Sequence, residues 1–274
     1  MPDRPVLRLG AVSYLNVRPL VFGLDADPDV SLRFDVPAVC ARLLDAGSID
    51  LGMVPSITWL DRHGDRIVPG LCIGSDGPVG SVALFTRREM RDVRTVALDA
   101  SSRTSAALVR IVCRRHYAID PVFLTQPPDV EAMLAVADAA LLIGDPALFL
   151  DHDALGLQKI DLGELWTAMT GLPFVWAFWS GPAGATTPGI VARLQRAADD
   201  GRRSLDAVAD AYCVDRPEWA AVARSYLREN MRYELGPREV EALRTYYGEV
   251  ARLGLTSGTV REPEFFEGPA GRRQ

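Results

Sequence analysis

A short apolar run, Val6–Val12, ends in the polar segment Ser13–Asn16, and Pro19 follows shortly afterwards. This order predicts a buried β-strand that leads into a helix started by the proline. In an open α/β sheet, such a strand end faces the binding crevice. Because no glycine-rich loop is present here, we expect Ser13 and Asn16 to meet a small anion rather than a phosphate chain. A capping or turn role for Asn16 stays open beside this interpretation.

A second junction of the same design follows the predicted strand Thr95–Leu98. It carries Ser101, Ser102, Thr104 and Ser105 before a predicted helix. Any helix start favours one such residue, but four hydroxyls exceed what capping needs, and with the helix dipole they suit a carboxylate. Arg103 lies among them and shares a helical face with other arginines, which is also typical of a solvated stripe. Two such junctions facing each other would form a cleft.

Short apolar runs alternate with helical patterns, which predicts an α/β fold with a mainly parallel sheet. The scheme of strand, polar junction and helix occurs in two halves, so we expect two lobes of similar topology with the ligand cleft between them. After Phe174–Ser180 the pattern becomes helical. We expect the tail from Gly268 to be disordered.

Further candidate ligand contacts lie where other predicted strands begin or end. Ser81 begins a strand after a glycine-rich turn, and Ser56 follows the strand Ile49–Val54. Asp145 follows another strand and either caps a helix or places a carboxylate in the site. Phe174 belongs to a dense aromatic run, one face of which could wall a ring-shaped ligand while the other packs in the core.

Composition excludes several classes of function. The 274 residues carry a net charge of −6, so the chain as a whole does not attract nucleic acid. No run is long and apolar enough to span a membrane, and the N-terminus lacks the pattern of a secretory signal. The four cysteines and three histidines have no metal-ligand spacing. We therefore expect a cytoplasmic protein without a metal, and without a cofactor, since no P-loop or dinucleotide motif occurs.

Taken together, five segments resemble the chorismate dehydratase family of the futalosine route to menaquinone. The resemblance extends from about Leu7 to about Leu253. The segments that carry it are Gly10–Asn16 with Pro19-Leu20, Asp76–Ser81, Ser101–Ser105, Leu142–Asp145 and Gly171–Ala177.

The resemblance implies the fold of a type II periplasmic binding protein, with two α/β lobes joined by two crossings. Residues 1–87 and 180–274 would form one lobe, and residues 88–179 the other. The implied reaction removes water from chorismate to give 3-[(1-carboxyvinyl)oxy]benzoate, as a cofactor-independent carbon–oxygen lyase.

On this hypothesis Ser102, Thr104 and Ser105 bind a substrate carboxylate, with Ser81 contributing, and Asn16 orients the reacting carbon or hydroxyl. An amide is a poor base, so the side-chain carboxylate of chorismate itself is a candidate proton acceptor. Chorismate is the only partner expected from the sequence, and the oligomeric state stays open.

Three alternatives remain at this point. A binding protein of the same fold without catalysis is one, because fold does not decide function. The related 1,4-dihydroxy-6-naphthoate synthase of the same pathway is another, although its first motif differs. The effector-binding half of a transcription regulator is the third, and it needs a helix-turn-helix that the sequence does not show.

Overall fold

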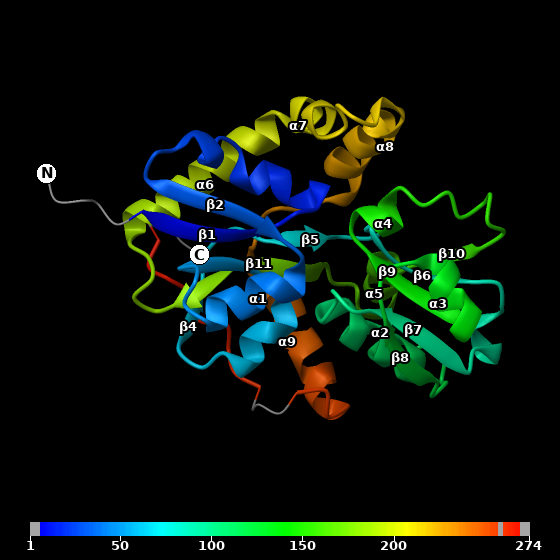
Figure 1. Cartoon of the computed structure of the whole chain (residues 1–274). Coiled ribbons are helices and arrows are strands. Elements are labelled where there is room, and N and C mark those ends of the chain that lie inside the picture. Colours follow the sequence, from blue (N-terminus) through cyan, green and yellow to red (C-terminus); the bar gives the residue numbers. More distant parts are fainter. Residues whose placement is uncertain (1–5, 257–259, 269–274) are drawn as a thin grey trace, which may run out of the picture.

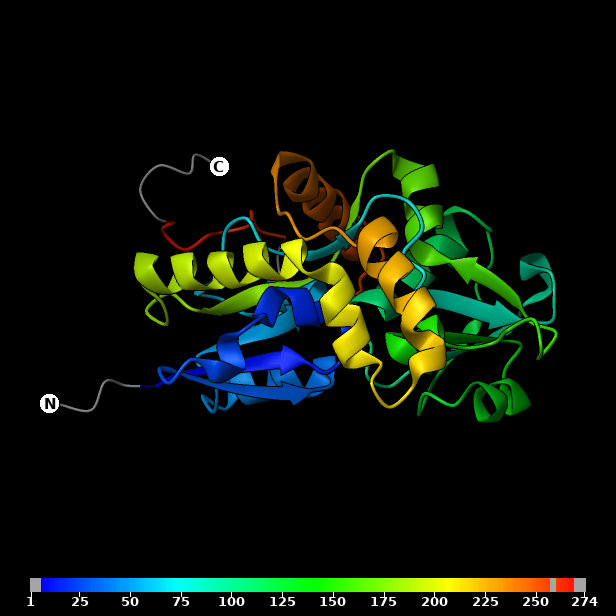
Figure 2. The same ribbon diagram turned by 90° about the horizontal axis from the view of Figure 1, so that it is seen from above.

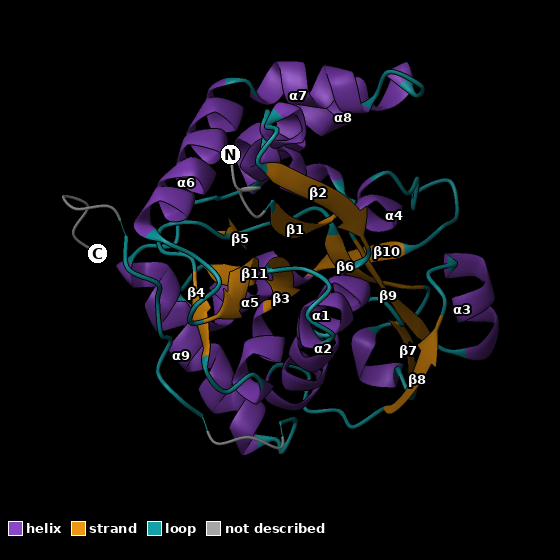
Figure 3. Ribbon diagram, turned by 60° about the vertical axis from the view of Figure 1, so that its left-hand side comes forward, coloured by secondary structure: helices purple, strands orange, loops and turns teal. Residues whose placement is uncertain are grey.

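The computed structural model describes residues 6–256 and 260–268 of the chain. Within these residues the strands form a 6-stranded sheet and a 5-stranded sheet, which Figure 1 shows side by side. Helices lie on both sides of the strands (Figure 3). The predicted α/β architecture with two sheets is therefore confirmed. The expected disorder from Gly268 onward concerns residues that, apart from Gly268 itself, lie outside the described part.

The first sheet has the strand order β2-β1-β3-β11-β4, and β5 also pairs with β11. The strands β1, β2 and β3 are parallel to one another, whereas β11 runs antiparallel to β3, β4 and β5. The carboxyl ends of the parallel strands therefore share one edge. The bounds are β1 Leu7–Val12, β2 Val30–Asp35, β3 Leu51–Pro55, β4 Asp65–Ile67, β5 Ile73–Ser75 and β11 Phe174–Pro182.

The second sheet has the order β10-β6-β9-β7-β8. Here β7 is parallel to β8 and β9, whereas β6 runs antiparallel to β9 and β10. The strand β9 is buried along its whole length, as its apolar sequence predicts. The bounds are β6 Val82–Thr86, β7 Thr95–Asp99, β8 Val122–Gln126, β9 Ala139–Ile143 and β10 Gln158–Asp161.

The helices cover the faces of both sheets, and the last ones reach from the first sheet toward the second. Figure 2 shows this arrangement from above for the yellow to orange helices α6, α7 and α8. The α-helices are α1 Pro37–Asp45, α2 Thr104–Arg115, α3 Val130–Val136, α4 Asp145–Leu148, α5 Leu162–Thr170, α6 Pro188–Arg203, α7 Leu205–Tyr212, α8 Ala220–Ser225 and α9 Pro237–Arg252. The short 3₁₀ helices are η1 Leu15–Val21, η2 Leu24–Ala26, η3 Ser56–Asp61, η4 Met90–Asp92 and η5 Pro217–Trp219, and η6 Tyr226–Asn230 is π-helical.

The chain passes between the sheets twice, before β6 and before β11. We call the first sheet with its helices the first lobe, and the second sheet with its helices the second lobe. The predicted boundaries at 87/88 and 179/180 stay a prediction. If the lobes are divided by sheet membership alone, both boundaries lie earlier in the chain than predicted. The strand β6 already belongs to the second sheet, and β11 already belongs to the first.

One local prediction was wrong. Pro19 does not start a helix, since η1 already begins at Leu15 and contains the proline. At the start of η1 the Asp145 carboxylate, from the other lobe, accepts a hydrogen bond from the Leu15 N–H at 3.1 Å. Between β4 and β5, Gly70 adopts a left-handed conformation with φ 77°.

Candidate functional site

A cavity lies where the two lobes meet, and the space in it, together with the part open to solvent, measures about 540 Å³. Its first-lobe wall comes from the carboxyl end of β1, the start of η1, the end of β3 and part of β11. Its second-lobe wall comes from the start of β6, the end of β9 and the start of α2. This is the position at which open α/β sheets bind ligands. Most of the wall is apolar, and a few polar groups project from the two junctions.

Six predicted residues line this cavity, and four do not. The lining residues are Asn16, Ser81, Ser102, Arg103, Thr104 and Ser105. The residues outside the lining are Ser13, Ser56, Asp145 and Phe174. The structure thus joins the two predicted junctions in one cavity and places the other four side chains in supporting positions behind it.

Asn16 lies in the first turn of η1, shortly after the end of β1. Val12, Tyr14, Asn16 and Val17 line the cavity, whereas Ser13 does not. The Asn16 side chain does not cap η1, whose first turn has no side-chain cap. Its Oδ1 atom is buried and finds no hydrogen-bond partner among the described residues. Leaving such an atom unpaired costs about 1–3 kcal/mol, so this oxygen is ready to accept a hydrogen bond from a ligand.

The hydroxyls of the second junction do not cap α2 either, since the helix has no side-chain cap. Ser101 is used internally, because its hydroxyl donates to Asp99 at 2.6 Å. Thr104 contacts the first lobe, where its oxygen lies 3.4 Å from the Ser56 hydroxyl. The Ser102 Oγ atom is buried and has no partner in the described part of the chain. Ser102 and the first N–H groups of α2 are therefore available to an anion.

Arg103 supplies the positive charge of this wall. Its side chain is exposed, and it forms no ion pair with any described residue. Because Arg103 also lines the cavity, its guanidinium can meet a carboxylate entering from solvent.

Ser81 lies at the end of a tightly held crossing segment. Asp161 accepts hydrogen bonds from the N–H groups of Val79 and Gly80 at 3.0 and 2.6 Å. Lys159, the only lysine in the chain, donates to the Gly80 carbonyl at 2.6 Å. Burial lowers the pKa of this lysine. These contacts fix the backbone that leads into Ser81.

Asp145 ties the second lobe to the first rather than facing the cavity. Its carboxylate accepts from the Leu15 N–H and from the Tyr212 hydroxyl of α7. The Tyr212 oxygen also lies 3.1 Å from the Ser13 carbonyl oxygen, so its one proton is shared between these two acceptors. Burial raises the pKa of Asp145 above its usual range, although both hydrogen bonds oppose this effect. Asp145 and Tyr212 therefore hold the backbone around Asn16 in place.

Phe174 and Ser56 lie behind the cavity wall. Phe174 is buried among aromatic rings, with Trp166 at 5.2 Å and Tyr246 at 5.0 Å between ring centroids. Ser56 is also buried, and its hydroxyl donates to the Val175 carbonyl at 2.8 Å. On β11 the ring that lines the cavity is Trp176.

Sequence reasoning missed Tyr14 and Tyr226, and within the aromatic run it singled out Phe174 rather than Trp176. Tyr14 lies between β1 and η1 and lines the cavity. Its ring packs on Gly144, where an added Cβ atom would lie 2.5 Å from the ring. The irregular register of β11 between Val175 and Ala177 hid the placement of Trp176. No local pattern marked Tyr226, whose hydroxyl lies 2.7 Å from the Ser81 Oγ atom.

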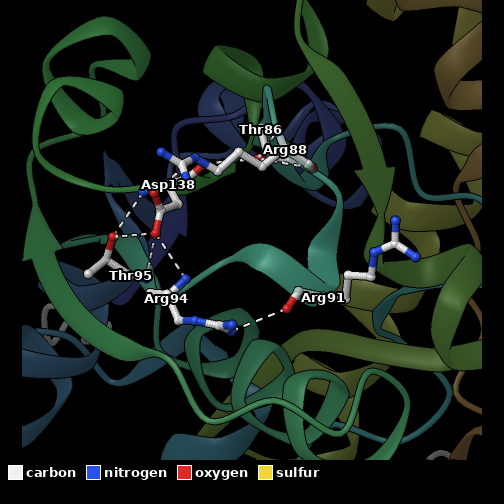
Figure 4. A network of polar contacts seen from close by, with 6 residues as sticks. All are labelled: Thr86, Arg88, Arg91, Arg94, Thr95 and Asp138. Atoms are coloured by element: carbon white, nitrogen blue, oxygen red, sulfur yellow. Dashed lines mark hydrogen bonds and ion pairs between the residues drawn. The ribbon is translucent and has the colours of Figure 1, made fainter.

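A second cavity, at the far end of the second sheet, is lined by Arg87, Arg88 and Asp138 among others. Two of its charged groups, Arg88 and Asp138, pair with one another. The Asp138 carboxylate accepts from the N–H groups of Arg94 and Thr95 and forms an ion pair with Arg88 at 3.2 Å (Figure 4). These contacts lower the pKa of Asp138. The network joins β6, β7 and β9 and thus has a structural role.

Two further searches covered the described residues only. They contain no group of three or more histidine, cysteine or carboxylate side chains that could hold a metal ion. They also contain no helix long and apolar enough to cross a membrane.

The two lobes with a cavity between them define the class of periplasmic-binding-protein-like folds, and solved structures support this. A Candida albicans protein described as having the generic periplasmic binding protein fold aligns with a TM-score of 0.68 and 10% identity, covering 97% of this chain and 99% of its own. The periplasmic aliphatic sulphonate binding protein of Escherichia coli aligns with a TM-score of 0.64 and 18% identity, covering 98% and 95%. At these identities the likeness shows the fold alone.

The family is shown by a different comparison. The model of a menaquinone biosynthesis family matches residues 7–252, and the chain belongs to this family. A chorismate dehydratase of Thermus thermophilus is 29% identical, with 93% of this chain and 98% of that protein covered. The family resemblance of the sequence motifs is thereby confirmed.

Proposed function

We propose that the protein is a chorismate dehydratase, which removes water from chorismate to give 3-[(1-carboxyvinyl)oxy]benzoate. The observation that carries the proposal is the cavity itself, in which an unpartnered acceptor on Asn16 faces the anion-binding start of α2. Membership of the menaquinone biosynthesis family and the similarity to a chorismate dehydratase support this substrate.

Chorismate carries carboxylates on its ring and on its side chain. The start of α2 suits one of them, because Ser102 and the free N–H groups donate hydrogen bonds and Arg103 adds a positive charge. The apolar wall, which includes Val79 and Trp176, suits the ring. We assign carboxylate binding to the second lobe and ring orientation to the first.

The dehydration is a carbon–oxygen lyase reaction that breaks a C–H and a C–O bond, and aromatisation of the ring supplies the driving force. Asn16 would orient the ring hydroxyl or the reacting carbon through its Oδ1 atom. An amide does not take the proton, so the proton passes to the side-chain carboxylate of the substrate, and the hydroxide released from the C–O bond regains a proton and leaves as water. The cavity lining contains no aspartate, glutamate or histidine, which agrees with a substrate group acting as the base.

This scheme requires no metal or cofactor, and we place the reaction in the cytoplasm. The four cysteines are free and buried, which suits a reducing compartment. An assay must separate this function from two rivals, a protein of the same fold that binds an anion without changing it and the naphthoate synthase of the same pathway.

The test is to incubate purified protein with chorismate after dialysis against a chelator, without nucleotide, and to follow the products by mass spectrometry. We expect stoichiometric conversion to the dehydrated benzoate. Bound but unchanged chorismate would favour the binding protein. Turnover of a cyclised futalosine derivative instead would favour the naphthoate synthase.

A further inference from the structure

Two consecutive tyrosines of α9, Tyr246 and Tyr247, are buried, and each donates its hydroxyl proton to a backbone carbonyl. The Tyr246 hydroxyl lies 2.9 Å from the Thr104 carbonyl oxygen at the start of α2. The Tyr247 hydroxyl lies 2.8 Å from the Ser56 carbonyl oxygen at the start of η3. A carbonyl oxygen only accepts hydrogen bonds, so the tyrosine is the donor in both contacts. One helix therefore bonds to a helix start in each lobe.

Packing holds the Tyr246 hydroxyl in this place. Its ring meets the rings of Phe174 and Trp166 edge to face, with centroid distances of 5.0 and 6.1 Å. Burial raises the pKa of Tyr246, so the hydroxyl keeps its proton. Farther along α9, Glu249 forms an ion pair at 2.7 Å with Arg115, the last residue of α2. The helix α2 is therefore held against α9 at both of its ends.

The Thr104 carbonyl and the Ser105 N–H belong to one peptide unit, and in a helix they point in opposite directions along the axis. The Ser105 N–H lies in the first turn of α2, so it has no partner within the helix. It points toward the end of α2 that lines the cavity. A hydrogen bond to the carbonyl polarises the peptide unit and strengthens its N–H as a donor. Tyr246 thus acts, through one peptide unit, on a donor at the cavity.

The contact of Tyr247 has no such consequence. The N–H in the same peptide unit as the Ser56 carbonyl is that of Ile57, and it donates to the Thr104 hydroxyl oxygen at 3.4 Å. Neither Ser56 nor Ile57 lines the cavity. The two tyrosines therefore make the same kind of buried contact, but only Tyr246 makes it at a helix start that faces the cavity.

We propose that Tyr246 is a positioning residue for the donors at the start of α2, because it fixes the first turn and strengthens the Ser105 N–H toward a substrate carboxylate. This inference rests on the proposed function for its substrate. The carboxylate of chorismate then meets the Ser105 N–H in addition to Ser102 and Arg103. A side chain outside the cavity thereby contributes to the affinity of the site.

The first test compares Tyr246→Phe with Tyr247→Phe. Each variant loses one buried hydrogen bond, so both melting temperatures should fall by similar amounts. Tyr246→Phe should raise KM for chorismate about threefold, a fraction of the strength of one hydrogen bond to a charged group, with little change in kcat. Tyr247→Phe should leave KM unchanged. An unchanged KM in Tyr246→Phe, or an equal rise in both variants, would overturn the proposal.

A second measurement does not depend on turnover. In protein labelled with ¹⁵N-serine, the backbone amide signal missing from Ser105→Ala identifies Ser105. This signal should shift in Tyr246→Phe and stay in place in Tyr247→Phe, because only Tyr246 bonds to that peptide unit. If the signal does not move in a folded Tyr246→Phe protein, Tyr246 does not act on this donor and the proposal fails.

Failure of the proposed function would be seen separately. If the wild-type protein binds chorismate without dehydrating it, dissociation constants from calorimetric titration take the place of KM in the same comparison. A loss of affinity confined to Tyr246→Phe would then still support the positioning role. Equal affinities in the wild type and in both variants would contradict it.

Discussion

The two junctions that face the cavity have similar sequences but are built differently. At the second junction the first turn of α2 is free of side-chain caps, so that hydroxyls, N–H groups and Arg103 together form a set of donors. At the first junction a single amide, Asn16, faces the cavity, and its backbone is held from behind by Asp145 and Tyr212. A donor set binds an anion, whereas one fixed acceptor orients a reacting group. The second lobe therefore binds the anion, and the first lobe orients the reacting group.

The largest effect is expected at the first junction. Asn16→Ala should lower kcat for chorismate roughly 10²–10³-fold, as loss of a fixed polar group in an active site does. Affinity for chorismate should change little, because the donor set of α2 is intact. Steady-state kinetics and calorimetric titration measure the two quantities. Ser13→Ala is the matched control, since Ser13 does not line the cavity, and this change should leave both quantities nearly unchanged.

At the second junction the expected effect is on binding. Arg103→Ala should raise KM for chorismate about 10-fold, the size of one charge-assisted hydrogen bond at an exposed site, and should lower kcat much less. The salt dependence of KM should weaken with the charge gone. If kcat falls as strongly as in Asn16→Ala, the division between binding and orientation is wrong.

Ser102→Ala should have a smaller effect. It should stabilise the free protein slightly but weaken the binding of chorismate. Removing a buried hydroxyl without a partner should raise the melting temperature of the free protein slightly. The same change should raise KM about fivefold, because a hydrogen bond to the substrate is lost. Ser101→Ala serves as the control. It should lower the melting temperature, since it breaks the contact with Asp99, and a fivefold increase in its KM would contradict this assignment.

The second junction was more predictable from sequence than the first. The excess of hydroxyls between Ser101 and Ser105 is a local signal, and four members of that segment do line the cavity. Asn16 was identified for a similar local reason. The roles of Ser13 and Tyr14 depend on the direction of each side chain at the end of β1, where a shift of one residue exchanges the two faces.

The supporting residues could not be predicted because their partners are remote in the sequence. Asp145 contacts Leu15 and Tyr212, which lie in the other lobe. Tyr226 meets Ser81 through a π-helical turn that has no sequence signature. The fold was easier to predict, because the alternation of apolar runs and polar junctions is repeated in both halves. The antiparallel pairs that β11 forms in the first sheet and β6 forms in the second break that regularity.

The smallest effect is expected for Asp145, whose carboxylate connects the second lobe to the first junction through the Leu15 N–H. Burial raises the pKa of Asp145, so its ionised form is less favourable in the folded than in the unfolded chain. As the pH rises from below the unfolded pKa to above the folded one, Asp145 therefore lowers the free energy of unfolding. Asp145→Asn removes this penalty and can still pair with the Leu15 N–H and with Tyr212. Its melting temperature should exceed that of the wild type by a few degrees near neutral pH, and the difference should shrink as the pH falls to about 4.

Asp138→Asn provides a control of opposite sign. Its hydrogen bonds lower the pKa of Asp138, so the ionised form stabilises the folded chain above the unfolded pKa, and this contribution is lost as the pH falls through the folded pKa. Asp138→Asn should therefore melt below the wild type at neutral pH and approach it in acid. Calorimetric scans of both variants across this pH range give the comparison. Parallel pH profiles for the two would mean that Asp145 is not desolvated between the lobes, and the proposed link from the second lobe to Asn16 would be lost.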